Sequence, residues 1–150
     1  MRRRASDNEY LHRDFHGALS TGLEYLHRRY GAAAVREYLR QFTAAFYAPL
    51  SREIGRRGLA AIRDHYRKVY ETEGGRLSAS LTDHELTMTV PYSPAVRHLR
   101  RRGYPVARLF VETIRTVNET LCEGTPFEFE LVKYDPKTGS SVQRFYRRKQ

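Results

Sequence analysis

Residues 74–94 read GGRLSASLTDHELTMTVPYSP, and the hydrophobic period of the chain changes within this stretch. Before it, apolar residues recur every three or four positions, as they do along a helix that buries one face. After Gly74 and Gly75 they alternate with polar residues, which is typical of a half-buried strand. The alternating positions are Leu77, Ala79, Leu81, Leu86, Met88 and Val90. The polar segment 82–85 lies between the two runs, so the stretch predicts an antiparallel hairpin.

Helices are predicted throughout the part of the chain that precedes this hairpin. Phe15, Leu19 and Leu23 start one apolar stripe, and Gly31 stands where a C-terminal cap is expected. Similar stripes continue up to the two glycines, where the last helix of this part ends. The predicted segments are three helices, at 14–29, 33–47 and 59–72, and a short helical turn at 51–57.

Two more helices and a second pair of strands are predicted after the hairpin. Ser93 and Pro94 suit the cap and first position of a helix over residues 94–101, and Pro105 opens another that continues to Leu121. Strand patterns then occupy residues 127–131 and 142–146, around the turn at 135–139. The order predicts an α+β fold, in which N-terminal helices pack on one face of a four-stranded antiparallel sheet and two further helices lie between the strand pairs. We expect one domain over residues 14–150, behind a flexible segment at 1–13.

The composition is that of a globular protein. The chain has 150 residues, of which 40% are hydrophobic and 29% charged, so it can bury a core as a single domain. Its apolar runs are shorter than the ~20 residues that a membrane-spanning helix needs, and no membrane association is expected. Cys122 is the single cysteine, which rules out an internal disulfide and fits a reducing cytoplasm.

Arginine dominates the charge of the chain. The net charge is +10, and all but four of the 27 basic residues are arginine. Arginine pairs with carboxylates and phosphates through two parallel hydrogen bonds, so an anionic partner is expected. Arginine-rich usage also follows from a GC-rich genome. The basic clusters are scattered along the chain rather than gathered on one element, which argues against a sequence-specific nucleic-acid face. They are Arg2–Arg4, Arg28–Arg29, Arg56–Arg57, Arg100–Arg102 and Arg147–Lys149.

Three side chains are predicted to carry acid–base chemistry: His65, Glu73 and His16. His65 lies beside the apolar stripe of its helix, where a histidine can act as a base, or can simply hydrogen-bond within the core. Glu73 follows two helical turns later on the same side, at a helix end whose dipole disfavours a carboxylate. A solvated Glu73 is the alternative. His16 borders the core of the first helix, so either Glu73 or His16 is predicted to orient His65.

A ligand site is predicted where the hairpin leads into the helix at Pro94. The free amides of a helix start can bind an anion, so Tyr92, Ser93 and Arg97 are candidate substrate-binding residues, although Ser93 can also serve only as a cap. Asn118 lies on an apolar helix face, where its amide would bind either the ligand or the next strand.

The sequence names no metal and no cofactor. His12, Asp14 and His16 resemble a metal set, but residues two apart point in different directions on a helix. The chain also lacks phosphate-binding glycine loops, His-Glu-x-x-His and paired-cysteine spacings.

One stretch resembles a known family. The run Val90–Ala95, which reads VPYSPA, resembles the L-2-amino-thiazoline-4-carboxylic acid hydrolase-like family, as do the strand at 83–88 and the strand entry at 123–129. The likeness extends over residues 15–148 as an order of elements. Family members often carry Cys-Pro-Ala where this chain has Ser93–Pro94–Ala95. The resemblance implies a small-molecule pocket and a ring-opening hydrolysis.

Three functions remain open on the sequence. The first is a protein that binds a small carboxylated metabolite and hydrolyses a C–N bond, or a ring C–N or C–S bond. The second is a ligand-binding or dimerising module without catalysis, and a homodimer is compatible with it. The third is an arginine-rich nucleic-acid-binding protein, which is expected to bind weakly and without sequence preference.

Overall fold

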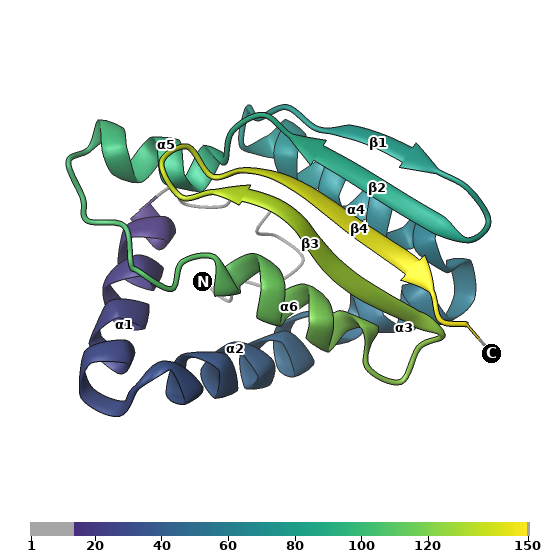
Figure 1. Cartoon of the computed structure of the whole chain (residues 1–150), viewed down its shortest axis with the longest axis horizontal. Helices are drawn as coiled ribbons and strands as arrows, with labels where there is room; N and C mark the ends of the chain where they lie inside the picture. The colour runs from purple at the N-terminus through teal and green to yellow at the C-terminus, as the bar shows by residue number, and fades with distance from the viewer. Residues whose placement is uncertain (1–13, 150) are drawn as a thin grey trace, which may run out of the picture.

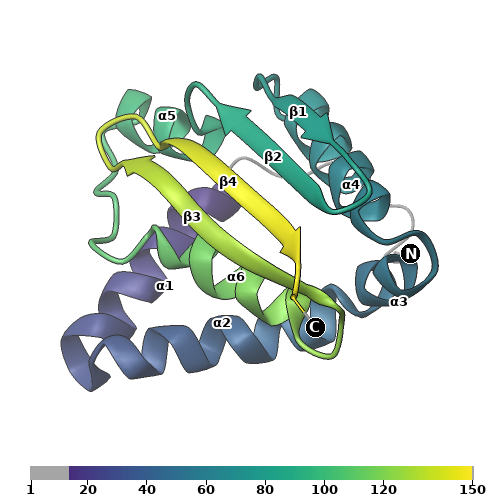
Figure 2. The same ribbon diagram turned by 45° about the vertical axis from the view of Figure 1, so that its right-hand side comes forward.

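The computed structural model describes residues 14–149, which form six helices and one sheet of four antiparallel strands (Figures 1 and 2). The predicted α+β class is therefore confirmed. Helices occupy the chain up to Thr72, and strands begin only after Gly75, where the hydrophobic period changes. The elements are α1 (Asp14–Tyr30), α2 (Ala32–Phe46), α3 (Ala48–Arg57), α4 (Leu59–Thr72), β1 (Ser78–Leu81), β2 (Glu85–Val90), α5 (Pro94–Arg101), α6 (Glu112–Cys122), β3 (Phe127–Asp135) and β4 (Ser140–Arg147). The predicted flexible segment 1–13, with His12 and Arg2–Arg4, lies outside the described residues.

The sheet joins two hairpins side by side. The strand order is β1-β2-β4-β3, so β2 and β4 form the centre and β1 and β3 the edges. Met88 of β2 faces Gln143 of β4, and Leu86 faces Phe145, which aligns the buried positions of both hairpins on one face. A register shift between Leu131 and Lys133 bends the long edge strand β3.

Within residues 14–149, helices cover one face of the sheet. Leu86, Met88 and Phe145 are each 0% exposed on that face, and burying one such side chain contributes about 2 kcal/mol. Helix α4 packs against β1 and β2, and α6 packs against β3. Helix α2 backs α6, and α1 contacts both α2 and α5, so the helices form a layer behind the sheet in Figure 2. None of the helices within residues 14–149 is long and apolar enough to cross a membrane.

The segment after Pro105 departs from the sequence-based prediction. A helix was expected to begin at Pro105, but α6 begins only at Glu112. The reason is tertiary: the Ala107 amide donates to the hydroxyl of Ser20 on α1 (2.8 Å), and the Arg108 amide donates to the carboxylate of Glu24 (3.2 Å). Because these amides bond to α1, they are not available for a helix, and residues 104–107 have no regular secondary structure. Helix α3 is also longer than the predicted turn, because it begins at Ala48.

Candidate functional site

A histidine and a glutamate from distant parts of the chain meet between α1 and α4. His16 lies in the first turn of α1, and Glu73 is the C-cap of α4. His16 Nε2 and Glu73 Oε1 are 2.5 Å apart, and the two side chains are only 12% and 14% exposed. Glu73 stands at the negative end of the helix dipole, where a carboxylate is disfavoured, and the hydrogen bond with the His16 ring offsets this position. The pair is thus a mostly buried, hydrogen-bonded acid–base couple.

Further titratable groups lie around His16 at the junction of α1 and α5. The His98 ring is 6.3 Å from the His16 ring, and His98 Nε2 is 4.0 Å from a carboxylate oxygen of Asp14. Among the described residues, no three histidine, cysteine, aspartate or glutamate side chains are arranged to hold a metal ion. The alternating set that included His12 reaches beyond the described part of the chain.

Two tyrosines flank Glu73. Burial and the negative charge of Glu73 raise the pKa of Tyr47, between α2 and α3, and that of Tyr70 on α4. Within residues 14–149, neither hydroxyl has a hydrogen-bond partner. Both phenols therefore stay protonated at neutral pH and can donate a hydrogen bond to a molecule bound beside Glu73.

His65 lies on α4, about two helical turns before Glu73. Its ring is held edge-on between Tyr47 (centroids 5.5 Å apart) and Tyr66 (5.0 Å), and burial followed by the charge of Lys68 lowers its pKa to about 4. Its Nε2 atom is buried and has no hydrogen-bond partner among the described residues. The ring is therefore neutral at physiological pH.

The predicted partnership of His65 with Glu73 or His16 is not supported by a hydrogen bond within residues 14–149. Glu73 is engaged by His16 instead. Tyr47 is a neighbour of both residues. Its ring contacts the His65 ring, and the charge of Glu73 adds to burial in raising the pKa of its hydroxyl. A catalytic role for His65 stays a prediction.

Asn118 belongs to a buried polar network that crosses from α4 to the sheet. Its side-chain oxygen accepts a hydrogen bond from the Tyr66 hydroxyl, and its amide nitrogen donates to Gln143 Oε1 (3.1 Å). Gln143 in turn donates to the hydroxyl of Ser141 (3.0 Å). The amide thus bonds to a strand, which was one of the two roles considered for it, and ligand contact by Asn118 stays a prediction.

The strand-to-helix junction packs against the C-terminal end of α4. Tyr92 donates a hydrogen bond to the Gly74 carbonyl (3.3 Å). A Cβ on Gly75 would lie 2.6 Å from Pro94 and 2.9 Å from the ring of Tyr70, so the junction and helix approach as closely as a glycine permits. Tyr92 and Pro94 are therefore neighbours of the helix end that carries Glu73.

Ser93 acts as the cap of α5. Its hydroxyl accepts a hydrogen bond from the Val96 amide (3.2 Å), and its own amide donates to the Thr138 carbonyl (2.9 Å). Gly139 lies directly over it, since a Cβ there would come within 2.4 Å of the Ser93 Cβ. Anion binding by Ser93 stays a prediction, and its hydroxyl is already used within the fold.

Arg97 completes the group of predicted residues around this helix end. Its guanidinium lies 3.3 Å from the centroid of the Tyr92 ring, and the residue is exposed. Among the described residues it has no carboxylate partner. A cation stacked on an aromatic ring keeps its donors free at the edges, which suits it to bind an anion.

Tyr47, Tyr70 and His98 are site residues that sequence reasoning missed. Tyr70 precedes Glu73 by three residues, so helical spacing could have placed both on one side. Tyr47 lies in a gap between helices, and His98 in a short helix, where no periodic signal indicates direction.

Comparison with known proteins adds no relative: no family model matches the chain, and neither a curated protein nor a solved structure is significantly similar to it.

Proposed function

We propose that the chain binds a small carboxylated molecule at the C-terminal end of α4 and can hydrolyse a C–N bond in it. The observation that carries this proposal is the contact between His16 and Glu73. Two residues 57 positions apart form a 2.5 Å hydrogen bond with little solvent exposure. A carboxylate that fixes an imidazole in this way is a common arrangement for general acid–base catalysis.

The proposed hydrolysis uses the second nitrogen of the His16 ring and the two tyrosine hydroxyls beside Glu73. When Glu73 accepts the hydrogen bond of His16 Nε2–H, the lone pair of Nδ1 is the basic site. It can take a proton from a water molecule whose oxygen adds to the carbon of a C–N bond, and return that proton to the departing nitrogen. The hydroxyls of Tyr47 and Tyr70 are donors for the charge that develops on the substrate.

The carboxylate of the ligand is assigned to Arg97. This guanidinium is exposed and is stacked on Tyr92. It belongs to α5, whose first residue, Pro94, packs against the C-terminal end of α4. Bidentate pairing with arginine is a favoured way for a protein to bind a carboxylate. Binding without hydrolysis is the alternative function, and the same contacts would serve it.

The test combines a ligand screen with matched variants. A library of small carboxylic acids and their amides is screened by thermal shift and by release of amine. Glu73→Gln keeps the size of the side chain and removes its charge, while Glu71→Gln makes the same change at an exposed position on the same helix. We expect Glu73→Gln to abolish amine release and Arg97→Gln to weaken binding at least tenfold, with Glu71→Gln unchanged.

The outcomes separate the two functions. Binding that depends on Arg97 without any amine release supports the non-catalytic module. Ligands that bind equally well to wild type, Glu73→Gln and Arg97→Gln would show that the site lies elsewhere.

A further inference from the structure

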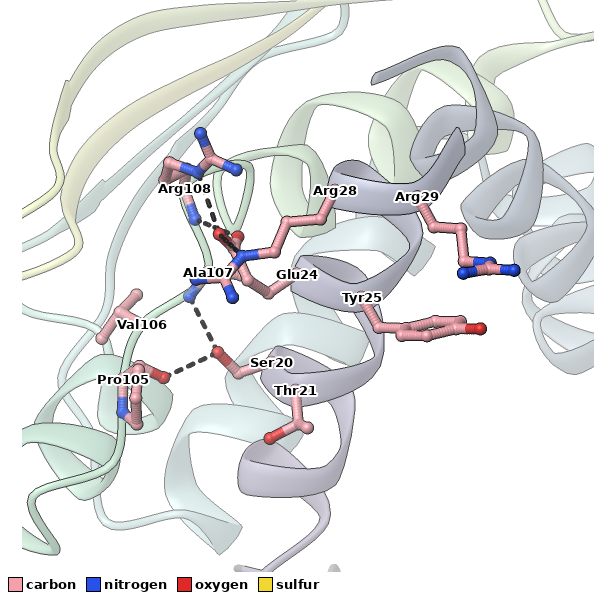
Figure 3. Close-up of a pocket in the computed structure, with 10 residues that line it drawn as sticks. All are labelled: Ser20, Thr21, Glu24, Tyr25, Arg28, Arg29, Pro105, Val106, Ala107 and Arg108. Carbon is pink, nitrogen blue, oxygen red and sulfur yellow. Dashed lines mark hydrogen bonds and ion pairs between the residues drawn. The ribbon is translucent and has the colours of Figure 1, made fainter. Parts of the chain in front are cut away.

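A groove runs along α1, beside the segment 105–108. Its volume is about 900 Å³, and it lies between α1 and the segment that begins at Pro105 (Figure 3). Its lining residues are Ser20, Thr21, Glu24, Tyr25, Arg28, Arg29, Pro105, Val106, Ala107 and Arg108. A second groove of about 430 Å³ shares Val106, Ala107 and Arg108 with the first. The two grooves meet at these shared residues, and together we call them the track.

The track is strongly basic. Arg28, Arg29 and Arg108 line the first groove, and Arg108, Arg115 and Lys133 line the second. The single acid that lines either groove within the described chain is Glu24, which pairs with both Arg108 (2.9 Å) and Arg28 (3.4 Å). Although partial burial opposes it, the hydrogen bonds from the backbone amide and the side chain of Arg108, together with the charges of Arg108 and Arg28, lower the pKa of Glu24, so it stays ionised and neutralises only one of the cations. The Arg28–Arg29 cluster and the single Arg108, which are far apart in the sequence, thus line the same groove.

The walls of the track also offer an aromatic surface, and part of the backbone at 105–108 is already hydrogen-bonded. Tyr25 lines the groove and is 57% exposed, and Figure 3 shows its ring beside the side chain of Arg29. The Pro105 carbonyl and the Ala107 amide point to the hydroxyl of Ser20, with which both are hydrogen-bonded. These two groups are therefore not available to read a base edge or to pair with a peptide strand.

We infer that this track binds single-stranded nucleic acid without sequence preference, with phosphates on Arg28, Arg29 and Arg108 and a base stacked on Tyr25. A concave cationic path with an exposed aromatic ring is how proteins hold single strands. A duplex is instead read by a convex element that enters its groove. An acidic peptide would match the charge, but it has no flat ring system to cover Tyr25. The net charge of +10 favours association with a polyanion in general.

The test is fluorescence anisotropy with a labelled oligothymidylate of about twelve nucleotides, titrated over a range of salt concentrations. We expect the logarithm of the binding constant to fall with the logarithm of salt with a slope of about −2, because each neutralised phosphate of a single strand contributes about 0.7. Removing a stacking ring should weaken binding at least about fivefold. Tyr25→Ala is compared with Tyr38→Ala, which removes a tyrosine that is 45% exposed on α2.

Matched double variants separate the groove from net charge. Arg28→Gln/Arg29→Gln lowers the charge by the same amount as Arg40→Gln/Arg67→Gln, whose arginines are exposed on α2 and α4. We expect at least a tenfold loss and a shallower salt slope for the groove pair, and less than a twofold change for the other pair. All four arginines are exposed, so circular dichroism should report an unchanged fold.

Three results would overturn the inference. Equal losses in both double variants would reduce the effect to bulk charge. No binding at low salt would exclude it. An oligoglutamate peptide of similar length that binds more tightly than the oligonucleotide, in an Arg28- and Arg29-dependent manner, would assign the track to an acidic protein partner.

Discussion

His65 makes the stability of the fold depend on pH in a way that can be calculated. Its ordinary pKa of 6.5 falls to about 4 in the folded chain, first because the ring is buried and second because of Lys68. Between these two values the unfolded chain binds a proton that the folded chain does not. Stability is therefore complete above the unfolded pKa and declines as the pH falls towards 4.

The size of the loss follows from the two pKa values. Their difference corresponds to about 3 kcal/mol when it is fully expressed. At about pH 5 the unfolded histidine is almost fully protonated and the folded one is not, so about 2 kcal/mol should already be lost relative to pH 7.5. Carboxylates with lowered pKa values, such as Glu85 and Glu128, contribute mainly below that pH.

Urea unfolding of wild type and His65→Phe at the two pH values measures this contribution. Phenylalanine keeps a ring between Tyr47 and Tyr66 but cannot bind a proton. We expect the free energy of unfolding of the variant to change by about 2 kcal/mol less than that of wild type between pH 7.5 and pH 5. His84→Gln, at an exposed hairpin position, should behave like wild type. Identical pH dependence in wild type and His65→Phe would mean that His65 is not held neutral.

Three further outcomes test the packing around the site. Gly139→Ala should destabilise the fold by at least about 2 kcal/mol in urea unfolding, because its φ of +70° and the 2.4 Å approach of the new Cβ to Ser93 both oppose a side chain. Asn118→Leu should cost about 2 kcal/mol by thermal unfolding, because two buried polar groups lose their partner. Cys122 should react with iodoacetamide at least about a hundredfold more slowly in the folded chain than in urea, because burial raises the pKa of its thiol to about 12.

Local patterns predicted most elements of the fold. Helix α4 ends where it was predicted to end, because a glycine pair follows it. Helix α5 begins where it was predicted to begin, because Ser93 and Pro94 form its cap and first position. The segment after Pro105 was mispredicted because its conformation depends on a hydroxyl and a carboxylate of α1, about 85 residues away. A contact of that kind leaves no trace in the periodicity of either segment.

The candidate site was predicted as a set of residues but not as an arrangement. His16 and Glu73 were both identified, each from its place on its own helix, yet their pairing depends on how α1 crosses the end of α4. The sequence instead suggested that one of them would orient His65. The spacing of a helix relates residues of that helix only, so the partner of Glu73 could not be found from it.

The arrangement itself depends on two glycines that carry no chemistry. Gly75 allows Pro94 to lie against the end of α4, and Gly139 allows the β3–β4 turn to cover Ser93. Helix α5 is thereby fixed at both sides of its first turn, and with it the position of Arg97 relative to Glu73. A side chain at either glycine would displace α5 without touching His16 or Glu73. The proposed anion binding by Arg97 and the His16–Glu73 pair should therefore respond separately to mutation.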